Sequence, residues 1–123
     1  MIAALDAQLD ELLHPFDQEA WAVLPEETRT RLEQDVECAR QRSEEVHRLS
    51  YLTLRERLFV VQALELGRRL GIDFGTQAED ERIVSVRNDI AHGRPVRSGA
   101  DVIDALAAAE RILDSIREAL GRS

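Results

Sequence analysis

The stretch Arg87-Asn88-Asp89-Ile90-Ala91-His92-Gly93 brings a permanent cation, an amide, a carboxylate and an imidazole together within a few residues. Apolar residues precede it at helical spacing, and Gly93 followed by Pro95 is a typical helix stop. We therefore expect the stretch to close a helix. At about 100° per residue, Arg87 and His92 lie about 140° apart around a regular helix. They share a face only if the last turn loosens or if a partner surface wraps around the helix end.

Outward from this stretch, apolar residues recur at helical spacing along the whole chain. They predict helices at about residues 2–13, 25–49, 53–70, 76–92 and 98–120. Thr53 with Glu56, and Thr76 with Glu79, have the spacing of capping boxes at helix starts. No segment shows the alternation that is typical of a strand. We therefore predict an all-α, up-and-down bundle of about five helices, forming a single domain over residues 1–123.

The predicted helices differ in how much of their surface is apolar. Segment 53–70 is apolar around most of its circumference, so we expect it at the centre, whereas segment 25–49 has only a narrow stripe. The narrow stripe suits a peripheral position, or a seam that awaits a partner. The positions expected to face inward in the last two helices are Ile83, Val84, Val86, Ile90, Val102, Leu106, Ala109, Leu113, Ile116 and Leu120.

The first two predicted helices are joined by an apolar segment. His14-Pro15 should end the first helix, because the residue before a proline avoids helical backbone angles. Phe16, Trp21, Val23 and Leu24 follow as an apolar connector, in which we expect Trp21 to seal one end of the bundle. His14 and His47 are interpreted as structural or solvent-facing.

Composition restricts the class of protein. The net charge of −8 disfavours broad electrostatic capture of nucleic acid, although a local basic site remains compatible with it. Cys38 is the only cysteine, which excludes a disulfide framework and a cysteine zinc site, and we predict neither a metal nor a cofactor. No apolar run is long enough to span a membrane, and the N-terminus lacks the positive start of a signal peptide. We expect a cytoplasmic protein without a membrane partner.

The stretch 87–93, at the end of the penultimate predicted helix of an all-α chain, resembles the motif of the HEPN superfamily. That motif is an arginine followed by a histidine after four to six residues, often with an asparagine directly after the arginine. Arg87, Asn88 and His92 fit it at the four-residue spacing. The resemblance is close over the motif and loose over the rest of the bundle, where segment 53–70 also looks like the helix that precedes the motif.

The resemblance implies a homodimer in which two motif helices meet and form one cleft. Many HEPN proteins are metal-independent ribonucleases of toxin–antitoxin, phage-defence or CRISPR systems, and a cognate antitoxin or partner protein is implied with them. Such chemistry needs a group that handles the proton of the ribose 2′-hydroxyl and groups that stabilise charge on the phosphate. We assign the first role to His92 and the second to Arg87, with Asn88 orienting the histidine or holding substrate. Arg94 and Arg97 are predicted to bind RNA.

The sequence departs from the family pattern in two places. HEPN toxins paired with small nucleotidyltransferases often carry a tyrosine two residues after the histidine, where this chain has Arg94, so we do not predict that form of control. Asp89, inside the motif, partly offsets the positive charge of the predicted site.

Other interpretations stay open on the sequence alone. In a purely structural interpretation, Arg87 forms an ion pair with Asp89, with Glu81 or with an acid on another helix, and His92 only caps its helix. A non-catalytic interaction module on the same scaffold is the main functional alternative to a nuclease. A helix-turn-helix regulator is disfavoured, because no predicted helix has a basic face.

Overall fold

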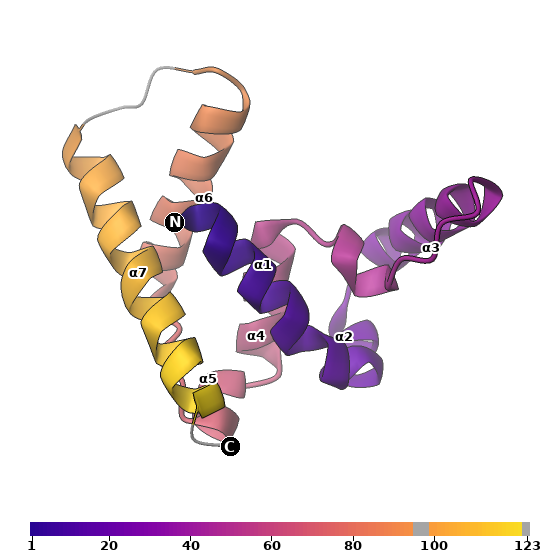
Figure 1. Cartoon of the computed structure of the whole chain (residues 1–123), viewed down its shortest axis with the longest axis horizontal. Coiled ribbons are helices and arrows are strands. Elements are labelled where there is room, and N and C mark those ends of the chain that lie inside the picture. Colours follow the sequence, from indigo (N-terminus) through magenta and orange to yellow (C-terminus); the bar gives the residue numbers. More distant parts are fainter. Residues whose placement is uncertain (95–98, 122–123) are drawn as a thin grey trace.

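The computed structural model describes residues 1–94 and 99–121, and these residues contain helices and no strands. The prediction of an all-α fold is therefore confirmed. The elements, shown in Figure 1, are α1 (Ile2–Leu13), η1 (His14–Phe16), α2 (Asp17–Val23), α3 (Glu26–Gln41), η2 (Arg48–Tyr51), α4 (Leu54–Ala63), α5 (Leu66–Leu70), α6 (Gln77–Ala91) and α7 (Gly99–Gly121). Not one of the described helices is long and apolar enough to cross a membrane.

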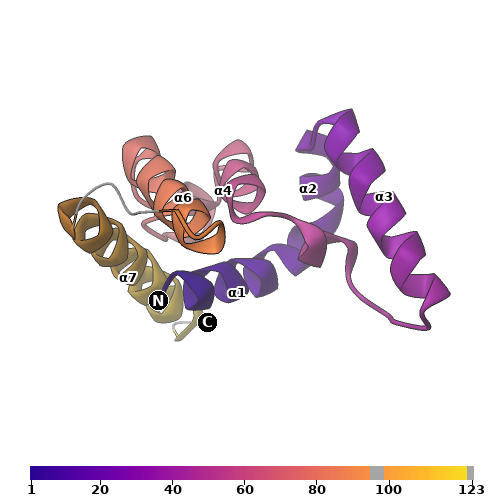
Figure 2. The ribbon, with the colours of Figure 1, turned by 90° about the horizontal axis from the view of Figure 1, so that it is seen from above.

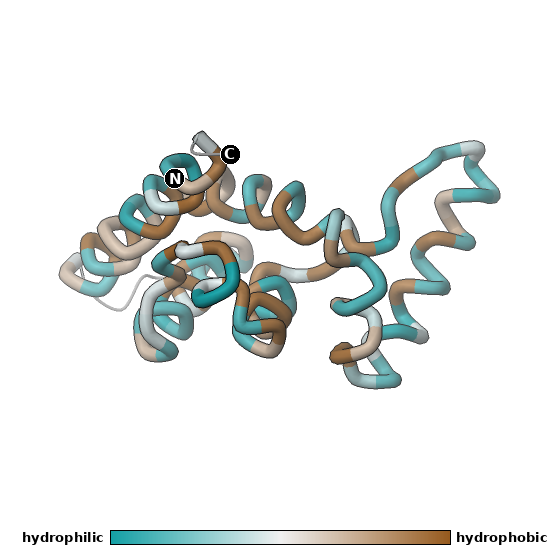
Figure 3. The backbone as a smooth tube through the Cα atoms, turned by 90° about the horizontal axis from the view of Figure 1, so that it is seen from below, coloured by the Kyte–Doolittle hydropathy of each residue, from teal (hydrophilic) through white to brown (hydrophobic). Residues whose placement is uncertain are grey.

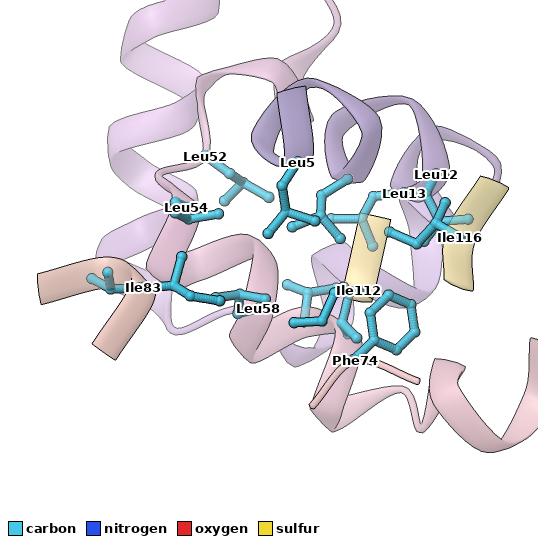
Figure 4. Packing of buried hydrophobic residues seen from close by; sticks show 14 of the residues in the cluster. Leu5, Leu12, Leu13, Leu52, Leu54, Leu58, Phe74, Ile83, Ile112 and Ile116 are labelled. Carbon is cyan, nitrogen blue, oxygen red and sulfur yellow. The ribbon is translucent and has the colours of Figure 1, made fainter. Parts of the chain in front are cut away.

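Four of these helices build the core. α6 and α7 run antiparallel side by side, α1 lies against both α7 and α4, and α4 also contacts α6 (Figures 1 and 2). Figure 4 shows aliphatic side chains of these four helices pointing toward one another. Leu5, Leu9, Ile83, Ile112 and Ile116 have no measurable exposure, so burial of aliphatic surface is the main force that holds the bundle together.

The helix α3 lies to one side of this core (Figures 1 and 2). It packs mainly against η2, and of its residues only Leu32 and Ala39 are buried. Figure 3 shows the hydrophilic colour that dominates its length. The peripheral position predicted from its narrow apolar stripe is therefore correct. A bidentate ion pair also ties α3 to α4, with Arg31 donating to the two Glu56 carboxylate oxygens at 2.5 and 2.8 Å.

The second predicted helix ends earlier than expected. α3 stops at Gln41 rather than near residue 49, and Ser43 adopts a left-handed φ of 60°. The N–H of Glu44 then donates to the Ala39 carbonyl at 2.9 Å, which closes a Schellman cap without a glycine. The chain turns back because Leu49 belongs to the core and has no exposed surface. This is a tertiary demand that helical spacing does not reveal.

The third predicted helix is broken in two. α4 ends at Ala63 and α5 begins at Leu66, with Glu65 between them at a left-handed φ of 53°. The break brings Leu66 fully into the core. It also allows Gly67 to approach the next segment so closely that a Cβ at this position would lie 3.1 Å from the carbonyl oxygen of Ile72. The central position predicted for this segment is correct, since α4 contacts α1, α2, α5 and α6.

The apolar connector after the first helix is itself helical. Pro15 occupies an early position of η1, where its missing N–H is tolerated, and α2 follows directly with Asp17 and Glu19 in its first turn. Trp21 is half-buried rather than a full seal. Its ring is covered by the guanidinium of Arg48, whose Cζ lies 3.8 Å from the ring centroid.

Several positions expected to face inward are exposed. Ile83, Val84 and Val86 are buried as predicted, but Ile90 is 63% exposed, because the end of α6 projects beyond the core. On α7 the buried stripe is shorter along the helix than predicted and lies more on small residues. Leu106 and Leu120 are exposed, whereas the buried residues are Ala105, Ala108, Ala109, Ile112, Leu113 and Ile116.

Candidate functional site

The helix α6 has well-defined ends, and these position the predicted motif. Its N-terminus has the predicted capping box, in which Thr76 and Glu79 each accept a hydrogen bond from the other's backbone N–H. At the other end the N–H of Gly93 donates to the Ile90 carbonyl at 3.2 Å, and the N–H of Arg94 donates to the Asp89 carbonyl at 2.8 Å. These two bonds, with Gly93 at a left-handed φ of 65°, form a Schellman cap.

The last turn of α6 stays regular up to its end. The N–H of His92 donates to the Asn88 carbonyl at 3.0 Å, which is an ordinary α-helical bond. The turn has therefore not loosened, and Arg87 and His92 project in different directions from one helix. Of the two ways in which they were expected to share a site, only the approach of a partner surface remains.

The side chains of the predicted site face outward. Arg87 and His92 are exposed and Asn88 is half-buried. Among the described residues no carboxylate pairs with Arg87: Asp89 is engaged by Arg94, whose Nε lies 3.7 Å from Asp89 Oδ1, and Glu81 is engaged by Arg55. The ion pairs proposed for Arg87 in the structural reading are thus absent from the part of the chain that the structure describes.

Asp89 turns out to face the interior. It is only 9% exposed, and its Oδ1 lies 3.7 Å from Arg94 Nε. The negative charge expected inside the motif is therefore buried and faces Arg94 rather than pairing with Arg87. The same contact weakens the case for Arg94 as an independent RNA contact, because its guanidinium already lies close to Asp89. Arg97, the other predicted RNA-binding residue, lies outside the described residues.

A shallow groove of about 280 Å³ borders Arg87. It lies between the start of α1 and the end of α6, and it is lined by Ile2, Ala3, Asp6, Arg87 and Ile90. Most of this lining is apolar. Asp6 is the one acidic lining residue, and it is already paired with Arg57. An exposed isoleucine beside an arginine with no described ion-pair partner gives this end of the molecule both an apolar contact surface and an available cation.

A second polar cluster, which sequence reasoning did not assemble, joins α1, η1 and η2. The rings of His14 and His47 are stacked with centroids 4.0 Å apart. His14 Nε2 lies 3.0 Å from Asp10 Oδ1 and 3.3 Å from the Ser50 hydroxyl. Asp10 and Ser50 thus both contact the same imidazole nitrogen. A catalytic triad needs the carboxylate and the hydroxyl on opposite ring nitrogens, so this arrangement is not a triad.

The charges around this cluster are balanced locally. Arg48 donates to both carboxylate oxygens of Asp17, at 2.9 and 2.7 Å, and this lowers the pKa of Asp17. Burial, together with the adjacent His14, lowers the pKa of His47. The structural role expected for both histidines agrees with these contacts, which fasten η2 to α1 and α2. Sequence spacing could not find the cluster, because its two halves, Asp10 with His14 and His47 with Ser50, are more than 30 residues apart in the chain.

Within residues 1–94 and 99–121, no three His, Cys, Asp or Glu side chains are grouped as metal ligands. Cys38 is exposed. Comparisons of the chain with family models, with curated proteins and with solved structures found no match.

Proposed function

We propose that this protein is a homodimeric, metal-independent endoribonuclease whose site combines Arg87, Asn88 and His92 from two chains. The observation that carries the proposal is the state of the motif: Arg87 and His92 are exposed at the end of α6, and no described residue pairs with either side chain. Ten of the arginines in the described part of the chain form ion pairs, so most described arginines have a partner and the unpaired state of Arg87 is informative.

The proposed chemistry follows from these groups. The 2′-hydroxyl of the substrate attacks the adjacent phosphorus, and the bond to the 5′-oxygen of the next nucleotide breaks, which leaves a 2′,3′-cyclic phosphate. His92 of one chain takes or delivers a proton, and the second chain supplies the second acid–base group, because each chain has one histidine at this place. The flat guanidinium of Arg87 stabilises charge on the phosphate oxygens.

The groove beside Arg87 supports the dimer in this proposal. Ile90 is 63% exposed and continues the apolar lining made by Ile2 and Ala3. Covering these residues with a second copy would bury apolar surface and bring two motif helices together. Because Arg87 and His92 of one regular helix face different directions, such an approach is also what places an arginine of one chain near a histidine of the other.

A non-catalytic interaction module is the second candidate. The net charge of −8 favours it, and so does Asp6, which lines the groove next to Arg87 and would repel an RNA phosphate. In this case the same exposed surface binds a partner protein, and no RNA is cleaved. A toxin or phage-defence role belongs to the first candidate only.

The test is cleavage of a mixed RNA pool by purified protein with EDTA present. We expect the wild type to cleave, and Arg87→Ala and His92→Ala to lose at least about 100-fold in rate, as for removal of one transition-state donor. Arg87→Lys should fail as well, since lysine lacks the bidentate fork. Arg117→Ala removes an equally exposed arginine from α7 and should cleave like the wild type.

Thermal melts of all four variants separate loss of chemistry from loss of folding. Each substituted side chain is exposed and unpaired among the described residues, so stability should change by no more than about 0.5 kcal/mol. Full activity of His92→Ala would remove the catalytic assignment. A wild type that is dimeric and inert toward RNA would favour the interaction module.

A further inference from the structure

A second groove lies between α4 and α6 and shares no lining residue with the groove beside Arg87. Its volume is about 250 Å³, and its lining residues are Arg55, Leu58, Phe59, Gln62, Gln77, Asp80, Glu81 and Val84. Pockets for drug-sized ligands are usually about 300–1,000 Å³. This groove is therefore suited to one long side chain rather than to a large ligand.

Asp80 sits in this groove with an unsatisfied carboxylate oxygen. The residue is only 6% exposed. Gln62 Nε2 donates to Asp80 Oδ2 at 2.8 Å, whereas Oδ1 is buried and has no hydrogen-bond partner among the described residues. A buried acceptor without a donor is costly, and a carboxylate oxygen binds most strongly to a cationic donor. The unsatisfied oxygen thus indicates a positively charged group as the occupant.

The other charges in the groove do not meet this need. Arg55 donates to both carboxylate oxygens of Glu81, at 3.1 Å each, and the two exposed side chains neutralise one another. Among the described residues that line the groove, Asp80 is therefore the charged one without an oppositely charged partner. Charge complementarity with an incoming cation therefore depends on Asp80.

The apolar part of the groove suits a flat cation. Leu58 and Val84 are buried beneath the groove, but Phe59 is 47% exposed, which is unusual for a phenylalanine on the central helix. An aromatic face attracts a cation, and guanidinium stacks on it while keeping its N–H groups free for hydrogen bonds. The Gln62 amide oxygen accepts no hydrogen bond among the described residues and offers a second acceptor beside Asp80.

We propose that the groove between α4 and α6 binds an arginine side chain of a partner protein, with the guanidinium on Asp80 Oδ1 and against the ring of Phe59. Because Oδ1 is buried, a side chain that lines the groove must move aside for the arginine to reach it. Arginine fits better than lysine, since its five N–H donors reach both acceptors and its plane matches the ring. The proposal does not depend on RNA cleavage.

Binding should also depend on pH. Burial raises the pKa of Asp80 to about 6, with a smaller contribution from Glu79 and Glu81 and against the opposing effect of the Gln62 hydrogen bond. Arg55 and Glu81 are the other titratable groups that line the groove. Affinity for a cation should therefore be full near pH 7.5 and should fall as the pH drops below 6.

The probe is the peptide acetyl-Gly-Arg-Gly-amide, titrated into the full-length protein and followed by backbone amide shifts in NMR. Its matched control carries citrulline, which has the shape of arginine without the charge. We expect saturable shifts around Phe59, Gln62 and Val84 with the arginine peptide, and at least tenfold weaker binding of the citrulline peptide. Binding should also weaken at least tenfold at pH 5.

Two variants make the test specific. Asp80→Asn keeps the shape of the side chain, removes the buried charge and should lose at least tenfold in affinity for the arginine peptide. Asp114→Asn makes the same change in net charge at an exposed site on α7 and should bind like the wild type.

Four results would overturn the proposal. Equal binding of the two peptides, or binding that Asp80→Asn leaves intact, would exclude recognition of arginine by Asp80. Methylguanidinium that binds as tightly as the peptide would identify a site for a small cation. Dissociation of a dimer by Asp80→Asn in analytical ultracentrifugation would show that the occupant is a second copy of this chain.

Discussion

At the scale of single residues, exposure and pairing separate side chains that the sequence presents as equivalent. Arg87 and Arg94 both belong to the motif region, yet Arg94 approaches Asp89 while Arg87 has no described partner. Asp89 and Asp80 are both on α6 and both buried, but one is near an arginine and the other has an unsatisfied oxygen. The chemistry available at each position follows from these contacts rather than from residue type.

Asp80 carries a prediction about stability. Its pKa is about 6 in the folded protein, against an ordinary value of 3.8 for an exposed aspartate, so ionisation costs folding free energy above pH 6. That cost vanishes as the pH falls below about 3.8. Asp80→Asn should therefore stabilise the protein by up to about 3 kcal/mol at pH 8, at about 1.4 kcal/mol for each unit of pKa difference, and by much less at pH 4.

Urea unfolding of Asp80→Asn and wild type at both pH values measures this difference. The comparison with wild type is needed because His47 changes stability with pH in the opposite direction. Its pKa is lowered in the folded protein, so the free energy of unfolding decreases as the pH falls below about 6.5. A variant that is less stable than wild type at pH 8 would show that the charged carboxylate stabilises the fold.

At the scale of helices, the sequence correctly predicted the features that depend on residues close together in the chain. The first helix was predicted with its observed bounds, and both capping boxes are present, because each depends on residues three positions apart. The breaks after Gln41 and Ala63 were missed. At both breaks a residue other than glycine, Ser43 or Glu65, takes the left-handed conformation, and a leucine that follows it, Leu49 or Leu66, is buried in the core.

The two Schellman caps give a paired prediction at this scale. Ser43 and Gly93 hold the same left-handed position after α3 and after α6, at φ 60° and 65°. Ser43→Gly should stabilise the protein by about 0.5–1 kcal/mol, and Gly93→Ala should destabilise it by about 1 kcal/mol, since a side chain is disfavoured there. A Cβ on Gly93 would meet no atom within 4 Å, so its effect would report the backbone alone.

Thermal or urea unfolding of the two variants is the measurement. Changes of the same sign in both variants would contradict the assignment of equivalent caps.

At the scale of the whole molecule, the position of the site was predictable but its surroundings were not. The order of helices places the motif at one end of the bundle, as expected from its place before the last loop. The exposure of Ile90 reversed an expectation, because helical spacing assigns it to the inner face, whereas the end of α6 extends past the residues that would cover it. The orientation of Asp89 likewise depends on packing.

The proposed dimer contact is tested at Ile90. Ile90→Asp places a charge in the apolar groove beside Arg87 and should weaken self-association at least tenfold, as measured by analytical ultracentrifugation, while reducing RNA cleavage in parallel. Val46→Asp changes another exposed aliphatic residue, which follows α3 in the chain, and should leave both unchanged. Both positions are exposed, so stability should change by no more than about 0.5 kcal/mol. Unchanged association of Ile90→Asp would place the dimer contact elsewhere.

The most direct test of the proposed function is the chemistry of the RNA ends found after the purified protein is incubated with RNA in EDTA. Attack by the 2′-hydroxyl under the control of Arg87 and His92 predicts a 2′,3′-cyclic phosphate on one product and a free 5′-hydroxyl on the other, with neither formed by His92→Ala. Products with a 3′-hydroxyl and a 5′-phosphate, or intact RNA after incubation with a demonstrably dimeric wild type, would contradict it.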